Sequence, residues 1–256
     1  IIYPNNANTR TGGTLVSSQD FSRISALHQK VMQRKLAENG LLPQDSLNRS
    51  DYLQALLGSP ELKAMGELIP SGADLQKSRN LGSVTSNLHP RIQTALLAFK
   101  SGLCVAADVM DGGYDTHDTH DGKHEPVLAN AADALDYLWT YAEQLGIADR
   151  LLVVVSSDFS RTPYYNSGNG KDHWNIGSYV IMEKNRSFTN RAVGETDGVQ
   201  NARKINPSTM VRDDSKGIIL TTAHVHKALR RYLGLEGTSL DKLFPFTLVE
   251  DCKFFG

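Results

Sequence analysis

The stretch Leu151-Leu152-Val153-Val154-Val155-Ser156-Ser157-Asp158 places five apolar residues directly before two serines and an acid. A short apolar run bounded by polar residues is typical of a strand that is buried on both faces of a parallel sheet. The chain continues as Phe159-Ser160-Arg161-Thr162-Pro163, so Asp158 and Arg161 follow the end of the predicted strand. We therefore expect a buried strand with an acid and an arginine at its carboxyl edge.

A helix and a second extended run precede this strand. Residues 126–145 show a helical pattern that Gly146 closes, as is common at helix C-termini. The run 103–109, before the loop 110–125, has the composition of another strand. A strand-helix-strand unit joins parallel strands, and ligands bind outside the carboxyl ends of such strands. The loops 110–125 and 156–173 should therefore share one edge of the sheet.

The remaining pattern is mostly helical before residue 90 and mixed after it. Apolar residues at three- and four-residue steps predict helices over residues 20–38, 59–68, 90–101 and 222–233, whereas 179–182 has the pattern of a strand and 183–216 that of a loop. We interpret residues 1–89 as a mainly helical segment that packs on the sheet. Residues 90–256 then form an α/β core that carries the polar loops.

Composition narrows the classes of function. Lys and Arg total 27 against 28 for Asp and Glu, a net charge of -1, so there is no basic excess to bind nucleic acid or anionic lipid. No run approaches the roughly 20 apolar residues of a transmembrane helix, and we expect no membrane span in this chain. Cys104 and Cys252 lack CxxC spacing, which argues against structural zinc. They form either a disulfide or two buried thiols, and the apolar run around Cys104 favours thiols.

The loop from Asp111 to His124 is the densest group of metal-ligand side chains in the sequence. It contains four Asp and three His in fourteen residues. Carboxylate oxygen and imidazole nitrogen bind zinc, manganese and iron, and a loop at a strand end can direct several of them to one point. A solvated polar loop would have a similar composition, so ligand density alone leaves both interpretations open.

Two further sites follow the predicted central strand. Asp158 is either a ligand or catalytic acid, or an Asp that caps a turn through its own backbone. Arg161 could orient an oxyanion with its planar fork of donors, or pair with a structural Asp. A third site, Asp172-His173, lies on the glycine-rich loop that begins at Gly168. Ser157, Thr116 and Thr119 are nucleophile candidates by location only, because no nucleophile motif surrounds them.

Several motifs, in this order, resemble those of a known family. They are Gly112-Gly-Tyr-Asp-Thr-His117 with His124, Ser157-Asp-Phe-Ser-Arg-Thr-Pro163 with Asn166, Gly170-Lys-Asp-His-Trp174 and Gly194-Glu-Thr-Asp-Gly198. The chain resembles a large bacterial family of exported, mostly uncharacterised proteins with Gly-Trp-Asp-Thr-His, Glu-Phe-Gly-Arg-Thr-Pro and Gly-Arg-Asp-His-Trp motifs. That family belongs to the alkaline phosphatase/sulfatase superfamily. The similarity covers residues 90–235.

The resemblance implies a three-layer α/β/α sandwich with a mostly parallel sheet. Its strand ends would supply ligands to one or two divalent metals (Zn, Mn, Mg or Ca), and Arg161 would contact an anionic substrate. The ligands that it implies are Asp115, His117, His124, Asp158, Asp172 and His173. The chain departs from the pattern at Tyr114, where Trp is usual, at Ser160, where Gly is usual, and at Asp158-Phe159, where better-known relatives have Asp-His.

Two functions remain open at this stage. One is a metal-dependent hydrolase of phosphate or sulfate esters, and the other is a catalytically inactive exported protein that binds partners or assembles with itself on the same scaffold. The superfamily's first metal-binding Asp and its Ser or Thr nucleophile are not recognisable. The chain therefore either begins after that half of the sheet or keeps the scaffold without the catalytic groups. Export to the periplasm or the exterior is implied by the resemblance, and a start at Ile1 without Met fits a processed chain.

Overall fold

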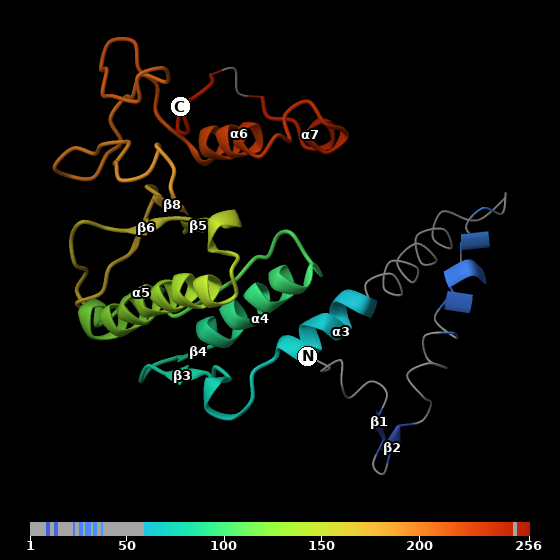
Figure 1. Cartoon of the computed structure of the whole chain (residues 1–256). Coiled ribbons are helices and arrows are strands. Elements are labelled where there is room, and N and C mark those ends of the chain that lie inside the picture. Colours follow the sequence, from blue (N-terminus) through green and yellow to red (C-terminus); the bar gives the residue numbers. More distant parts are fainter. Residues whose placement is uncertain are drawn as a thin grey trace. The chain divides into compact units, whose positions relative to one another are not determined.

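The computed structural model describes residues 9–10, 13–14, individual positions between 23 and 37, and residues 59–247 and 250–256 (Figure 1). The fold is mixed α/β, and each sheet of the described residues has two antiparallel strands. The chain forms two compact units, Ile1–Gly112 with Val127–Ile147, and Gly113–Pro126 with Ala148–Gly256. Each unit combines two segments that are separated in the sequence, and the boundary after residue 89 that the sequence suggested stays a prediction.

The first unit is built on helices whose positions the sequence largely predicts. Helix α3 is Ser59–Leu68, and helix α4 is Leu88–Ser101. Gly102 caps α4 with a left-handed φ of 79°, which glycine adopts without steric cost. Met65 of α3 and Leu97 of α4 are buried together, and Tyr141 packs against them. The remaining elements of this unit are β1 (Thr9–Arg10), β2 (Gly13–Thr14), the 3₁₀ turn Gly72–Asp74, β3 (Arg79–Asn80) and β4 (Thr85–Ser86).

The helix predicted over residues 20–38 lies mostly outside the described residues. The positions in that range that the structure does describe between Arg23 and Arg34 are helical. Leu27, on the predicted apolar stripe, is exposed.

Helix α5, His120–Gln144, begins six residues before the predicted start. The pattern placed the start at Pro126 because proline is favoured in the first helical turn, but here Pro126 lies inside the helix. The polar loop is therefore shorter than expected, and His124 lies on a helix. Gly146, at φ 68°, follows the end of α5 as predicted.

The expected parallel strand-helix-strand unit does not form. Residues 103–109 are not a strand, and Val105 is 98% exposed. Strand β5, Leu152–Ser156, pairs instead with β8, Tyr179–Glu183, in antiparallel register with Val154 opposite Ile181. The physical reason is that an apolar run marks a segment suited to a sheet but does not specify which other strand it pairs with, and only that partner supplies the ladder of hydrogen bonds.

Helix α6 (Thr222–Tyr232) and the irregular segment before it agree with the sequence pattern, whereas strands β6 (Ser160–Arg161) and β7 (His173–Trp174) and helix α7 (Ser239–Leu243) were not predicted. Residues 184–221 are irregular apart from isolated bridges such as Ile205 with Ile218. Strands β6 and β7 form a short antiparallel pair. The 3₁₀ turn Ala148–Arg150 completes the described elements. No described helix is long and apolar enough to cross a membrane.

Candidate metal centre

Backbone contacts within the second unit join the two polar loops. The Lys171 amide donates to the Thr116 carbonyl at 3.1 Å, and the His120 amide donates to the Asn169 carbonyl at 2.9 Å. Asp118 and Asn169 form an antiparallel bridge. The sequence therefore predicted correctly that the loops converge. The cause is antiparallel pairing of the loops themselves, not a shared edge of a parallel sheet.

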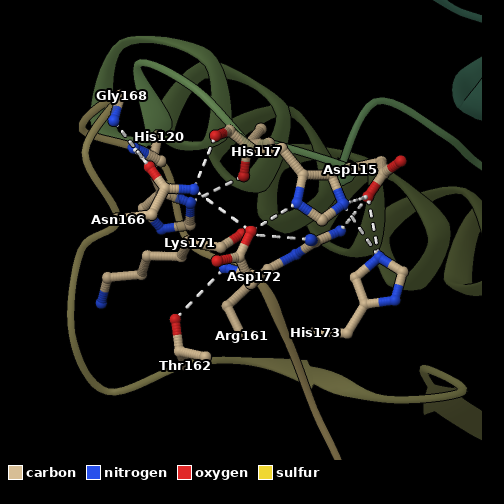
Figure 2. A network of polar contacts seen from close by, with 12 residues as sticks. Asp115, His117, His120, Arg161, Thr162, Asn166, Gly168, Lys171, Asp172 and His173 are labelled. Carbon is tan, nitrogen blue, oxygen red and sulfur yellow. Dashed lines mark hydrogen bonds and ion pairs between the residues drawn. The ribbon is translucent and has the colours of Figure 1, made fainter.

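Three side chains from these loops meet at one point (Figure 2). Ligand atoms of Asp115, His117 and His173 all lie within 4.8 Å of one another. The His117 Nε2 to His173 Nε2 distance is 3.0 Å, and Asp115 Oδ1 lies 3.1 Å from the first nitrogen and 3.2 Å from the second. All three side chains are exposed. Two imidazoles and a carboxylate in this arrangement could hold a metal ion.

Arg161 supports the carboxylate of this cluster. Its Nη2 donates to Asp115 Oδ1 at 2.6 Å, and its Nη1 donates to the Lys171 carbonyl at 3.2 Å. The side chain is only 12% exposed. The Arg161 guanidinium and then His173 hold the pKa of Asp115 below its ordinary value, so this carboxylate is ionised at neutral pH.

Aromatic packing holds the second imidazole. The rings of Phe159 and His173 stack with centroids 4.0 Å apart. Arg161 lies 5.4 Å from the centroid of the same Phe159 ring. Phe159 therefore connects the segment after β5 to the cluster, although it offers no ligand atom.

Asp172 contacts His117 on the side of the ring away from the cluster. Its Oδ1 lies 2.8 Å from His117 Nδ1, and Asn166 Nδ2 donates to the same oxygen at 3.1 Å. These two contacts, with His117 the larger, lower the pKa of Asp172. In the tautomer that donates Nδ1–H to this carboxylate, the His117 Nε2 offers its lone pair toward Asp115 and His173.

Two of the predicted ligands lie apart from this cluster. His124, on α5, stacks on His120 at 4.6 Å and meets the Tyr114 ring at 5.7 Å, and burial lowers its pKa. Asp158 Oδ1 accepts the amide of the next residue, Phe159, at 3.2 Å, and Asp158 is not part of the three-residue cluster. The structure thus brings together Asp115, His117 and His173, with Asp172 and Arg161 as their direct partners.

The comparison with known protein families supplies a classification. Residues 15–236 match a family described as "Protein of unknown function (DUF1501)". The chain belongs to the DUF1501 family. No curated protein and no solved structure matches it significantly. The matched region of this DUF1501 protein includes every residue of the cluster. The match supports the resemblance to a bacterial family of unknown function.

Sequence patterns did not indicate the contacts of three residues of this DUF1501 site. Asn166 binds both loops, Phe159 stacks on His173, and Thr116 Oγ1 lies 2.6 Å from His120 Nδ1. Asn166 stood in a recognised motif without a role, because an Asn before glycines usually indicates only a turn. Thr116 had been a nucleophile candidate, but it is 2% exposed and its hydroxyl contacts His120.

Proposed function

We propose that this protein is a metal-dependent hydrolase of phosphate or sulfate esters, of the alkaline phosphatase/sulfatase type. The observation that carries the proposal is the convergence of Asp115, His117 and His173 from two loops. Their atoms could coordinate a cation, because one carboxylate oxygen and two imidazole nitrogens lie within 4.8 Å of one another and all three are common metal ligands.

The ligand atoms of the cluster narrow the choice of metal ion. Two nitrogens and one oxygen suit Zn²⁺ or Mn²⁺, whereas Mg²⁺ and Ca²⁺ prefer oxygen ligands throughout. Three protein ligands leave coordination positions open, as in catalytic sites, whereas structural zinc sites are closed by four protein ligands. A metal bound here would polarise an ester oxygen and lower the pKa of a bound water.

The residues around the cluster have distinct roles in this proposal. Asp115, His117 and His173 would hold the metal, and Asp172 would orient His117. Arg161 fixes Asp115 and adds positive charge beside it, where it would favour the anionic oxygens of the ester.

The proposal includes the three-layer α/β/α sandwich of that superfamily, in which β5 and its antiparallel partner β8 would stand at one side of a mostly parallel sheet, as antiparallel edge strands do in mixed sheets. Its support is the sequence of β5, in which Leu152, Val153, Val154 and Val155 make both faces apolar. Val154 and Val155 are each 38% exposed. Strands that are apolar on both faces are typical of sheets covered on both sides.

Metal content tests the proposed site. The 256-residue chain would be loaded with Zn²⁺ or Mn²⁺, rinsed with a weak chelator and assayed by elemental analysis. We expect the parent to retain the ion and His117→Ala and His173→Ala to lose most of it, because each removes one of three ligands. Asp158→Asn should retain the ion, since its carboxylate contacts the Phe159 amide.

The matched control is His226→Ala, which removes an exposed histidine on α6. Equal metal content in the parent, His117→Ala and His173→Ala would disprove the proposed centre. Loss of metal in Asp158→Asn would instead support the larger ligand set that the family motifs imply.

One observation favours a catalytically inactive metal-binding protein as the second candidate. The Thr116 hydroxyl contacts His120, and the Ser157 hydroxyl donates to the Phe159 carbonyl at 2.8 Å. Among the candidates from the sequence, this leaves the exposed Thr119 or a water molecule as the nucleophile. Metal-loaded protein that hydrolyses neither p-nitrophenyl phosphate nor p-nitrophenyl sulfate would favour this second function.

A further inference from the structure

Asn166 uses the full hydrogen-bonding capacity of its amide. Its Oδ1 accepts from the backbone amides of Gly168 at 3.0 Å and Gly170 at 2.9 Å. Its Nδ2 donates to the His117 carbonyl at 2.9 Å and to Asp172 Oδ1 at 3.1 Å. A primary amide offers two donor hydrogens and two acceptor lone pairs. The oxygen thus shapes the glycine-rich loop, and the nitrogen contacts the other loop and the Asp172 carboxylate (Figure 2).

Both contacts of the nitrogen act on the same histidine. One holds the main chain of His117 through its carbonyl. The other holds the Asp172 oxygen that lies 2.8 Å from His117 Nδ1. The Asn166 side chain therefore fixes both the backbone position of His117 and the rotation of its ring. Partners of this kind fix the tautomer and direction of a histidine ligand.

We propose that Asn166 is a positioning residue of the metal centre, which directs His117 Nε2 toward Asp115 and His173 by holding both the His117 carbonyl and Asp172. This inference rests on the proposed function, because it concerns the same metal site. Asn166 itself offers no ligand atom to the cluster. Its effect on metal binding passes through His117.

The substitution Asn166→Asp keeps the oxygen acceptor of this side chain and replaces its NH₂ donor with a second oxygen. One carboxylate oxygen can still accept from Gly168 and Gly170, so the shape of the loop is retained. The other oxygen faces the His117 carbonyl and the Asp172 carboxylate, which are both acceptors, and two stabilising contacts become repulsive. A purely structural role in the loop predicts little change, whereas a positioning role predicts a weaker metal site.

Asn169→Asp is the matched control. Asn169 lies in the same loop and is exposed, and within the described parts of the chain its side chain makes no hydrogen bond. The substitution adds the same negative charge three residues away and leaves the contacts of His117 intact. The Asn169→Asp variant therefore measures how much an added negative charge in this loop changes metal affinity by itself.

The experiment titrates each chelator-treated full chain with Co²⁺, following its visible absorption, and records thermal unfolding of the metal-free proteins. We expect Asn166→Asp to weaken Co²⁺ binding about tenfold or more, in the range found for partners of metal ligands. We also expect an altered absorption band, because a misdirected imidazole changes the coordination. Asn169→Asp should bind Co²⁺ within about threefold of the parent, and metal-free unfolding temperatures should be similar.

Any other outcome would reject either the metal site or the role of Asn166. Parent protein that binds no Co²⁺ would reject the proposed metal site itself. Parent binding with unchanged or tighter binding in Asn166→Asp, or with equal weakening in both variants, would reject the role of Asn166 alone. If Asn166→Asp does not fold, Asn166→Ala replaces it, since it removes the amide's donors and its acceptor without adding charge. Failure of both variants to fold would mean that the role is structural, and would overturn the inference.

Discussion

Gly170 lies where the two loops of the candidate centre come closest. A Cβ atom at this position would overlap the carbonyl group of His117 and the backbone nitrogen of Asp118. The neighbours are backbone atoms, so they cannot rotate away as a flexible side chain would. The absence of a side chain at Gly170 thus permits the contact that brings His117 to Asp172 and His173.

We predict that Gly170→Ala destabilises the protein by about 1–3 kcal/mol, the usual range for overpacking, and lowers its metal affinity. Gly168→Ala is the control, since a Cβ there would meet its nearest atom, Asn166 Oδ1, at 3.5 Å, which is ordinary contact. Chemical denaturation gives the stability and Co²⁺ titration gives the affinity. Similar unfolding free energies for both variants would contradict this account.

At the scale of single residues, the candidate metal ligands were easier to predict than the residues that hold them in place. Asp115, His117 and His173 were named as candidate ligands because carboxylates and imidazoles are dense in these loops and stand in the family motifs, and the structure brings the three together. Asn166 and Phe159 carry no comparable signal. Their roles depend on which neighbour they meet in space, and a sequence does not state that.

At the scale of elements, the contact of α4 with α5 contains a buried histidine. His89 is 1% exposed, and its Nε2 lies 3.0 Å from Asp133 Oδ2. Arg79 also pairs with this carboxylate. Burial lowers the pKa of His89, and this outweighs the opposing effect of Asp133. The pKa of Asp133 is lowered by Arg79 and His89.

We predict that acid weakens this unit through His89. The folded pKa lies below the ordinary value of about 6.5, so the unfolded chain takes up the proton first as the pH falls. The stabilisation is complete above about pH 6.5 and is lost below it, as the pH falls toward the folded pKa. Unfolding temperatures at pH 7.5 and 5.5 measure the loss. His89→Gln should be less stable at pH 7.5 yet lose less between the two values, and exposed His226→Gln should behave like the parent.

Should His89→Gln show the same acid loss as the parent, another group would be responsible. His120 and His124 also have pKa values lowered by burial, so they would be the next histidines to substitute. Their shifts have the same sign and would act in the same pH range.

The helix C-termini that are followed by glycine were predicted well, whereas the start of α5 was predicted less accurately. Gly102, Gly146 and Gly234 follow α4, α5 and α6, with φ values of 79°, 68° and 69°. A left-handed residue after a helix is a local requirement that glycine meets best. The start of α5 was wrong by six residues, because Pro126 marks a favoured first turn without excluding an earlier one.

At the scale of the whole molecule, the two cysteines belong to different compact units. Cys104 lies in the first and Cys252 in the second, and both are free thiols. Cys252 is buried, and Cys104 is half-buried against the α3–α4 core. Burial raises the pKa of both thiols. The expectation of two thiols is confirmed, although Cys104 is less buried than predicted.

We predict that thiol titration under denaturing, non-reducing conditions finds two reactive groups. Under native conditions both should react more slowly than a small free thiol, because a raised pKa leaves less thiolate at neutral pH. Reaction with a chromogenic disulfide measures both. Finding no reactive thiol in the denatured chain would contradict the structure and indicate a disulfide.

Local pattern alone determined much of this protein. The helices that end at Gly102 and Gly234, the apolar strands β5 and β8, and the two loops rich in Asp and His all follow from residue types and spacing, which act over a few neighbours along the chain. The tertiary structure decided the rest. It paired β5 with β8 instead of with residues 103–109, and it separated His124 and Asp158 from the cluster. These outcomes depend on hydrogen-bond partners far apart in sequence, as between Asn166 and His117, and no local period records such a partner.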